Sequence, residues 1–173
     1  MATRIVVILL ICILSFPIYQ GRQEEKKALT KRTISIYDAK CRKFSGFRSY
    51  TEGDVKMCLS YRQDFKNYTD ARTYCSSVNS RLAVIKTWEK FQIVVPFVNA
   101  WIGLDDLETE GTFKWADGSV LDDHLKSRIF YPGEPNAYYP QENCVCQRCW
   151  TYFDKLCDTL CYLAKHYLCE KVI

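Results

Sequence analysis

Residues 101–118 read WIGLDDLETEGTFKWADG, and this stretch contains two strand signals around an acidic connection. Trp101–Leu104 and Thr112–Trp115 are rich in apolar and aromatic residues, which favour β-strands. Ala116–Ser119 contains an Asp-Gly pair, which is typical of a turn. The stretch therefore predicts two strands, with a turn after the second.

Two helix signals precede this stretch. Thr69-Asp70 can cap a helix that runs through Val78 and ends near Ser80-Arg81, and Thr87 can cap a second helix that ends near Pro96. Between them, the apolar run Leu82–Ile85 predicts a short buried strand.

The stretch is followed by a long segment with little periodicity, residues 120–142. Loops of this length are uncommon and tend to be functional. Residues 101–142 hold nine acidic residues against three basic ones, so a cation would be favoured in this part of the chain. Further strands are expected near residues 143–153 and 162–171. There is no repeat and no internal linker, so residues 41–173 are predicted to form one domain.

The N-terminal part differs in composition from the rest. Arg4 is followed by the apolar run Ile5–Ile18, which is shorter than the roughly 20 residues of a membrane span. We therefore expect a secretory signal peptide over residues 1–21, with a signal anchor as the alternative. Residues 22–40 are polar and basic and are expected to form a flexible extension. The net charge of the whole chain is only +4, so no strong overall field and no nucleic-acid partner is expected.

The chain contains ten cysteines. Removal of Cys12 with the signal peptide leaves nine, a density that indicates a disulfide framework in an exported protein. An odd number leaves one thiol free or bonded to another chain, which allows a disulfide-linked dimer. Asn67-Tyr68-Thr69 is a sequon and predicts a glycoprotein modified at Asn67.

Oxygen donors gather in the segment that starts at Glu134. Glu134, Asn136 and Glu142 offer two carboxylates and an amide carbonyl, a donor set that suits Ca²⁺. Pro135 restricts the backbone between the first two and, if its peptide bond is cis, aims both side chains at one point. By itself the motif is also an ordinary turn sequence.

Residues 58–171, and more loosely from residue 41, resemble a C-type lectin domain. The motifs that carry the resemblance are Trp101-Ile102-Gly103-Leu104, Phe113-Lys114-Trp115-Ala116-Asp117-Gly118, Gly133-Glu134-Pro135-Asn136, Glu142-Asn143-Cys144 and Tyr167-Leu168-Cys169-Glu170. The resemblance implies an α+β fold in which two helices flank small antiparallel sheets and a long calcium-binding loop. It also implies the disulfides Cys41–Cys58, Cys75–Cys169 and Cys144–Cys161.

The resemblance implies a calcium site and a sugar-binding role for Glu134, Asn136 and Glu142. The family's further ligands are an Asn-Asp pair, and here the matching pair is Cys157-Asp158 if Cys161 sets the register. If Cys157 pairs with Cys144 instead, Asp154 takes the place of the acid. The thiol replaces an amide in the first register, so the fifth ligand is lost. Asp106 and Glu110 match only part of a second calcium site, and surface salt bridging or plain solvation is the favoured explanation for them.

The order Glu-Pro-Asn resembles family members that bind mannose, fucose, glucose or N-acetylglucosamine, whereas galactose-type members carry Gln-Pro-Asp. We therefore expect a secreted Ca²⁺-dependent lectin. The alternative is a lectin-like module that binds a protein or a mineral. The five cysteines from Cys144 to Cys161 have spacings near those of zinc ligands, but disulfides are favoured in an exported chain. No nucleophile, base and orienting group occur together, so no enzyme is expected.

Overall fold

The computed structural model describes residues 20–25, 36–136, 141–149 and 154–173. Most of the expected signal peptide, residues 1–19, lies outside the described residues, as do residues 26–35 of the expected basic extension. Residues 20–25 and 36–41 are helical. Residues 40–173 form one compact unit, which contains all the strands named below.

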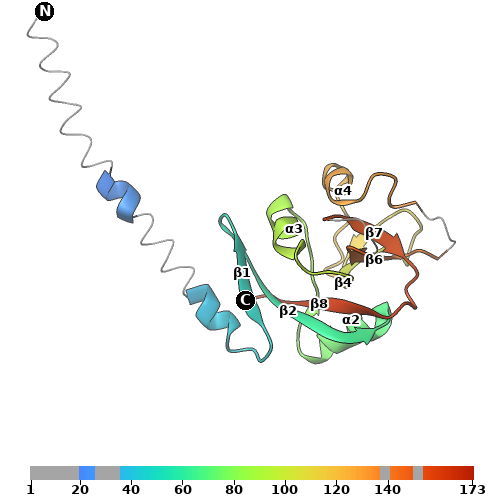
Figure 1. Cartoon of the computed structure of the whole chain (residues 1–173), viewed down its shortest axis with the longest axis horizontal. Helices are drawn as coiled ribbons and strands as arrows, with labels where there is room; N and C mark the ends of the chain where they lie inside the picture. The colour runs from blue at the N-terminus through green and yellow to red at the C-terminus, as the bar shows by residue number, and fades with distance from the viewer. Residues whose placement is uncertain (1–19, 26–35, 137–140, 150–153) are drawn as a thin grey trace, which may run out of the picture. The chain divides into compact units, whose positions relative to one another are not determined.

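One connected sheet organises this unit (Figure 1). Its strand order is β1-β2-β8-β4-β6-β7, with β3 paired to β8 and β5 paired to β4. The strands are β1 Arg48–Glu52, β2 Val55–Lys66, β3 Arg81–Leu82, β4 Ala100–Asp105, β5 Lys114–Trp115, β6 Cys144–Gln147, β7 Leu156–Thr159 and β8 Lys165–Lys171. The β4–β8 pair is parallel, and the other pairs of named strands are antiparallel.

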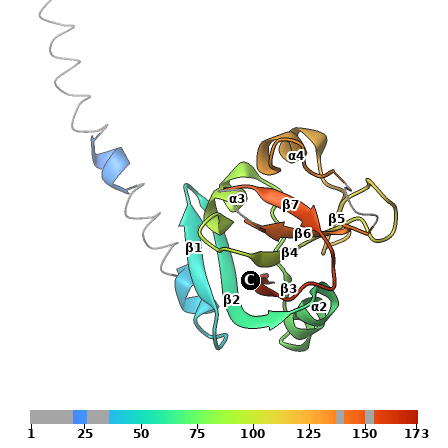
Figure 2. The ribbon, with the colours of Figure 1, turned by 45° about the vertical axis from the view of Figure 1, so that its right-hand side comes forward.

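The helices cover the sheet from opposite sides. Helix α2 (Tyr68–Ser77) lies on one side, and α3 (Trp88–Val94) and α4 (Asp123–Ile129) lie on the other in both views (Figures 1 and 2). The expected α+β class is confirmed. In detail, the described part of the compact unit holds a third named helix and a parallel strand pair that the sequence did not predict.

At position 103 of the central strand β4, close neighbours leave no room for a residue larger than glycine. A Cβ atom on Gly103 would lie 2.6 Å from the carbonyl oxygen of Leu82 and 2.7 Å from the Cβ of Ala116. The Gly103 N–H donates to the Ala83 carbonyl at 2.8 Å, and its own carbonyl accepts from Ala116 N–H at 2.8 Å. The glycine therefore lets three chain segments approach one another closely.

The expected strand over Leu82–Ile85 is only half right. The strand β3 ends at Leu82, although residues Ala83–Ile85 are fully buried. Their backbone groups are satisfied outside a regular ladder, because Ala83 N–H donates to Leu168 O at 2.8 Å and Val84 N–H donates to the Glu170 carboxylate at 3.1 Å. Burial alone therefore did not decide whether this run formed a strand.

The helix caps test the sequence predictions directly. Thr87 caps α3 by accepting from Lys90 N–H at 3.3 Å, as predicted. The predicted Thr69-Asp70 cap is wrong, because Asn67 caps α2 by accepting from Asp70 N–H at 2.8 Å. Both caps satisfy an N–H group that has no partner inside the helix.

Helix α4 lies within the segment that the sequence predicted to be irregular. Asp122 caps it by accepting from Leu125 N–H at 2.9 Å. Leu125 and Ile129 are buried, and their spacing of four residues places them on one face of the helix. An Asp followed by this apolar spacing was a signal that could have predicted α4.

Three disulfides join elements of the sheet and helices. Cys41 is bonded to Cys58 at the start of the domain, Cys75 of α2 to Cys169 of β8, and Cys144 of β6 to Cys161 after β7. These are the three pairs that the family resemblance implies.

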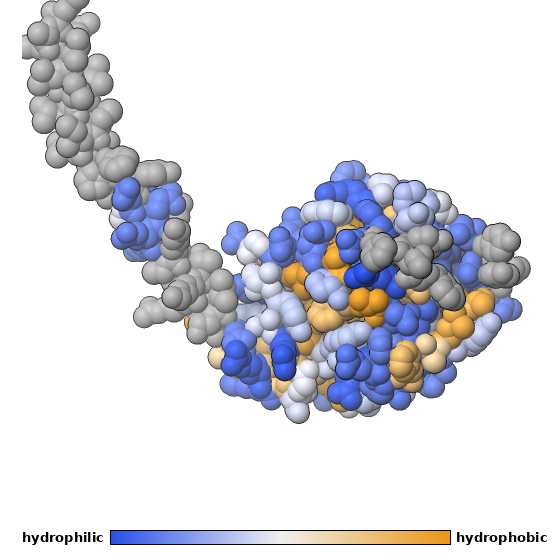
Figure 3. All heavy atoms as spheres, in the orientation of Figure 1, coloured by the Kyte–Doolittle hydropathy of each residue, from blue (hydrophilic) through white to orange (hydrophobic). Residues whose placement is uncertain are grey.

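The surface of the compact unit is mainly hydrophilic in the view of Figure 3, with hydrophobic side chains in separate patches. The exposed large apolar side chains come from distant positions in the chain, for example Phe65, Leu107 and Val120. Single exposed apolar residues of this kind are normal on a folded domain.

Candidate cation and carbohydrate site

The Glu134 motif forms a tight loop directly after α4. Glu134 N–H donates to Tyr131 O at 2.8 Å, and Gly133 has a φ of 93°, which glycine adopts without strain. The Glu134–Pro135 peptide bond is cis. Asn136 Nδ2 donates to Glu134 Oε1 at 3.0 Å, so the two side chains that flank Pro135 lie together.

Asp158 enters the same site from β7. It is paired with Val145 of β6 and is only 5% exposed. The Cys144–Cys161 disulfide places Cys161 next to the end of this strand pair. Asp154, the alternative acid, is exposed in the turn before β7.

Three carboxylates converge at Glu134. Burial, a hydrogen bond with Asp158 and the negative charges of Asp158 and Glu142 raise the pKa of Glu134 to about 8. A carboxylate beside other carboxylates resists ionisation because like charges repel. Glu134 Oε2 is also buried without a hydrogen-bond partner among the described residues. This arrangement of oxygen donors is what a bound cation would stabilise.

A second buried acid lies close to this group. Asp106 is 2% exposed, and burial, followed by the charges of Glu110 and Asp158, raises its pKa. Its Oδ2 accepts from Gly111 N–H at 2.8 Å, whereas its Oδ1 has no partner among the described residues. The expectation that Asp106 is a solvated surface acid is therefore wrong, because the Gly111 loop and the nearby carboxylates enclose it.

Comparison with known proteins gives the family. Residues 64–171 match the family model of the lectin C-type domain, which is more than half of the chain. The chain belongs to the C-type lectin domain family.

Proteins similar to this C-type lectin domain include a collectin and a carbohydrate-recognition domain. Collectin-11 of Bos taurus is 31% identical over 128 residues, which cover 69% of this chain and 44% of that protein. The cow C-type carbohydrate-recognition domain of CD23, solved in the presence of a GlcNAc2Man3 oligosaccharide, is 27% identical with a TM-score of 0.61 and covers 75% of this chain and 95% of that one.

The fold alone is also shared with proteins of another kind. The herring type II antifreeze protein has a TM-score of 0.62 at 18% identity, covering 75% of this chain and 98% of that one. This C-type lectin domain spans less than half the length of the curated relatives it matches. Among the described residues, no helix combines the length and apolar character that crossing a membrane requires.

In this C-type lectin domain Cys157 lies away from the oxygen donors of the candidate site. Its sulfur lies with those of Cys146 and Cys149, all three within 4.8 Å of one another. Neighbouring residues of a strand point to opposite faces, so the side chains of Cys157 and Asp158 lie in different surroundings. In the register that puts Asp158 among the ligands, the residue expected to match the family's amide ligand is therefore a buried cysteine.

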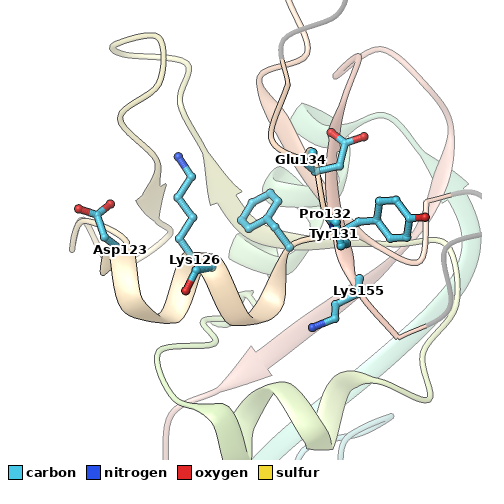
Figure 4. A pocket seen from close by; sticks show the side chains of 9 residues that line it. Asp123, Lys126, Tyr131, Pro132, Glu134 and Lys155 are labelled. Atoms are coloured by element: carbon cyan, nitrogen blue, oxygen red, sulfur yellow. The ribbon is translucent and has the colours of Figure 1, made fainter.

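A pocket adjoins the Glu134 loop (Figure 4). It has a volume of about 450 Å³ and lies between α4, the segment Tyr131–Glu134 and Lys155. Lys126 and Asp123 project from α4 at its border. Sequence reasoning did not find this pocket, because α4 itself was not predicted.

The predicted glycosylation position has a structural role as well. Asn67 is half-buried and caps α2 through its side-chain oxygen, and its Nδ2 donates to Asp70 Oδ2 at 2.9 Å. A glycan on Nδ2 would leave the capping oxygen in place, although it would disturb the bond to Asp70.

Proposed function

We propose that this domain is a secreted, calcium-dependent lectin for mannose-type glycans. The observation that carries the proposal is the convergence of Glu134, Glu142 and Asp158, with a buried Glu134 oxygen that lacks a donor. If these residues served only as a surface turn, their carboxylates would be expected to lie apart and in contact with solvent. We infer a binding role, without catalysis, and a cation as the central requirement.

The donor set fits Ca²⁺. Glu134, Asn136, Glu142 and Asp158 supply three carboxylates and one amide, and Ca²⁺ takes six to eight oxygen ligands. Glu134 and Asp158 are held by the backbone around them, Glu134 by its bond to Tyr131 and Asp158 by the β6–β7 ladder. When bound, Ca²⁺ would offer coordination positions to two vicinal sugar hydroxyls.

The protein groups would select the sugar through the direction of their hydrogen bonds. A Glu134 oxygen can accept from a sugar hydroxyl, and the Asn136 amide can donate to one. In the present structure these two groups bond to each other at 3.0 Å. Their order matches the mannose type in the family, which supports mannose, fucose, glucose or N-acetylglucosamine over galactose.

The affinity for one sugar should be low. Cys157 faces the sulfur cluster and supplies no amide donor, so one hydroxyl lacks a hydrogen bond worth about 1–2 kcal/mol. Useful binding would then depend on several domains that engage one glycan surface together.

The second candidate is a lectin-like module that binds a protein or a mineral partner. The replacement of the amide by Cys157 favours this candidate, because one hydrogen bond to a bound sugar would be missing. In that case the acid cluster could still hold a cation as a structural element.

A glycan array with Ca²⁺, and the same array with chelator, distinguishes the candidates. We expect binding to mannose-type glycans that chelator abolishes. Binding to no such glycan under either condition would overturn the lectin proposal and leave the second candidate.

The double variant Glu134→Gln, Asn136→Asp is the matched specificity test. It keeps the size of both side chains and exchanges acceptor for donor, so preference should move towards galactose. An unchanged sugar preference would show that these two residues do not contact the sugar.

A further inference from the structure

Among the residues that the structure describes, three cysteines remain outside the three disulfides described above: Cys146, Cys149 and Cys157. Cys146 on β6 and Cys157 on β7 are cross-strand partners, and Cys149 follows β6 by two residues. The Cα atoms of Cys146 and Cys149 are 5.5 Å apart, and those of Cys149 and Cys157 are 6.3 Å apart. Both separations fall within the range that a disulfide spans.

Cys149 is the shared member of this sulfur cluster. Its sulfur and those of Cys146 and Cys157 all lie within 4.8 Å of one another. The Cys149 sulfur also lies 3.2 Å from the carbonyl oxygens of both residues, which places it between the two strands. A sulfur atom forms only one disulfide bond, so the three sulfurs can form at most one disulfide among themselves, which leaves one thiol.

The remaining thiol is shielded. Cys146 is 0%, Cys149 5% and Cys157 1% exposed. A buried sulfur cannot reach a cysteine of another chain without opening of the β6–β7 region. The odd cysteine is thereby kept inside the domain, where its neighbours are the two sulfurs of a disulfide.

We propose that Cys146, Cys149 and Cys157 form an internal thiol–disulfide exchange site. In one form Cys146 is bonded to Cys149 and Cys157 is the thiol; in the other form Cys149 is bonded to Cys157 and Cys146 is the thiol. The inference does not depend on sugar or calcium binding, so failure of the proposed function would leave it intact.

The exchange balances without an added oxidant or reductant. Cys157 gives its proton to solvent, and its sulfur attacks the Cys149 sulfur. The Cys149–Cys157 bond forms while the Cys146–Cys149 bond breaks. The electron pair of the broken bond stays on the Cys146 sulfur, which takes up a proton. The reverse step has the same balance.

The two forms fasten β7 differently. Cys161 follows β7 and is bonded to Cys144 in both forms. When Cys157 is also bonded, disulfides anchor the chain on both sides of Asp158. When Cys157 is the thiol, only the anchor at Cys161 remains.

Differential alkylation tests the proposal on the full chain, produced under oxidising conditions. The protein is unfolded in denaturant with N-ethylmaleimide, then reduced, treated with iodoacetamide and digested with trypsin. Arg148 and Lys155 separate the three cysteines in sequence, so each falls in its own peptide. We expect the maleimide to be divided between Cys146 and Cys157, with little on Cys149 and none on Cys75 or Cys169.

Two single variants lock the cluster. Cys146→Ser leaves only the Cys149–Cys157 disulfide, and Cys157→Ser leaves only Cys146–Cys149, so both variants should lose the maleimide label in this region. The two forms of the wild type, once separated by chromatography, should return to the same ratio in native buffer without reductant.

Four results would overturn the proposal. The first is maleimide on one cysteine alone, and the second is separated forms that never return to the common ratio. The third is label on all three cysteines together with one equivalent of bound zinc, which would indicate a metal site. The fourth is a dimer on non-reducing gels that carries no label.

Discussion

Lys165 shows how a single buried charge makes stability depend on pH. It lies at the start of β8 with 4% of its surface exposed, and its ammonium group donates to Asn99 Oδ1 at 3.1 Å. Burial lowers its pKa from 10.5 to about 8. Between these values the unfolded chain still holds the proton that the folded protein has released, so Lys165 makes stability rise with pH across this window.

The variant Lys165→Met removes this titration. The stability of the wild type relative to this variant should therefore increase between pH 8 and pH 10.5, by about 1–3 kcal/mol. Thermal or urea unfolding at several pH values measures the difference. Lys43→Met, at an exposed position, is the control and should follow the wild type. A difference that stays constant with pH would contradict the prediction.

The proposed cation ligands allow a second prediction at the residue scale. With Ca²⁺ at 10 to 100 times its dissociation constant, the folded state should gain roughly 1.5–3 kcal/mol. Asp158→Asn should remove most of this gain, because Asp158 is buried beside Glu134. Asp154→Asn, in the exposed turn, should keep it. Thermal unfolding with Ca²⁺ and with chelator measures the gain for both variants. Loss of the gain in Asp154→Asn, with the gain kept in Asp158→Asn, would assign the ligand to Asp154.

At the scale of elements, α4 connects the fold to the candidate site, because the Glu134 loop begins where this helix ends. Asp122→Ala should lower the free energy of unfolding by about 1 kcal/mol through loss of the cap on Leu125 N–H. Asp122→Asn keeps an accepting oxygen and should stay within a few tenths of a kcal/mol of the wild type. Equilibrium unfolding of both variants checks this, and equal losses would rule out the capping explanation.

Elements were predictable where a local signal decides them. Thr87 and the apolar spacing behind it predicted α3, and Trp101–Leu104 predicted the core of β4. The hairpin of β1 and β2 was expected only through the family resemblance, and β7 was missed. In β7 all four residues are buried, including Asp158 and Thr159, so the alternation of polar and apolar residues that marks a half-exposed strand is absent.

At the scale of the whole molecule, disulfides of different span hold the domain. Cys75–Cys169 closes a sequence separation of 94 residues, and Cys41–Cys58 closes one of 17. In the chain-entropy model the longer loop is worth about 4–5 kcal/mol and the shorter one about 3 kcal/mol. The free energy of unfolding of the double variant Cys75→Ala, Cys169→Ala should therefore be lower than that of the double variant Cys41→Ala, Cys58→Ala by about 1–2 kcal/mol. Guanidinium unfolding of both double variants measures the difference. Equal free energies of unfolding would show that loop length does not determine how much each disulfide stabilises the domain.

The sequence by itself determined the family, the α+β class and the Glu134–Asn136 motif on which the proposed ligand rests. These follow from residue types that lie close together along the chain, where local backbone preferences and side-chain chemistry decide the outcome. Only the tertiary structure decided that Asp158 lies beside Glu134 and is buried, while Asp154 is exposed. It also placed Cys157 against Cys146 and Cys149, on the face away from the oxygen donors. Strand register and side-chain direction decide these points, and both depend on pairing between segments distant in sequence.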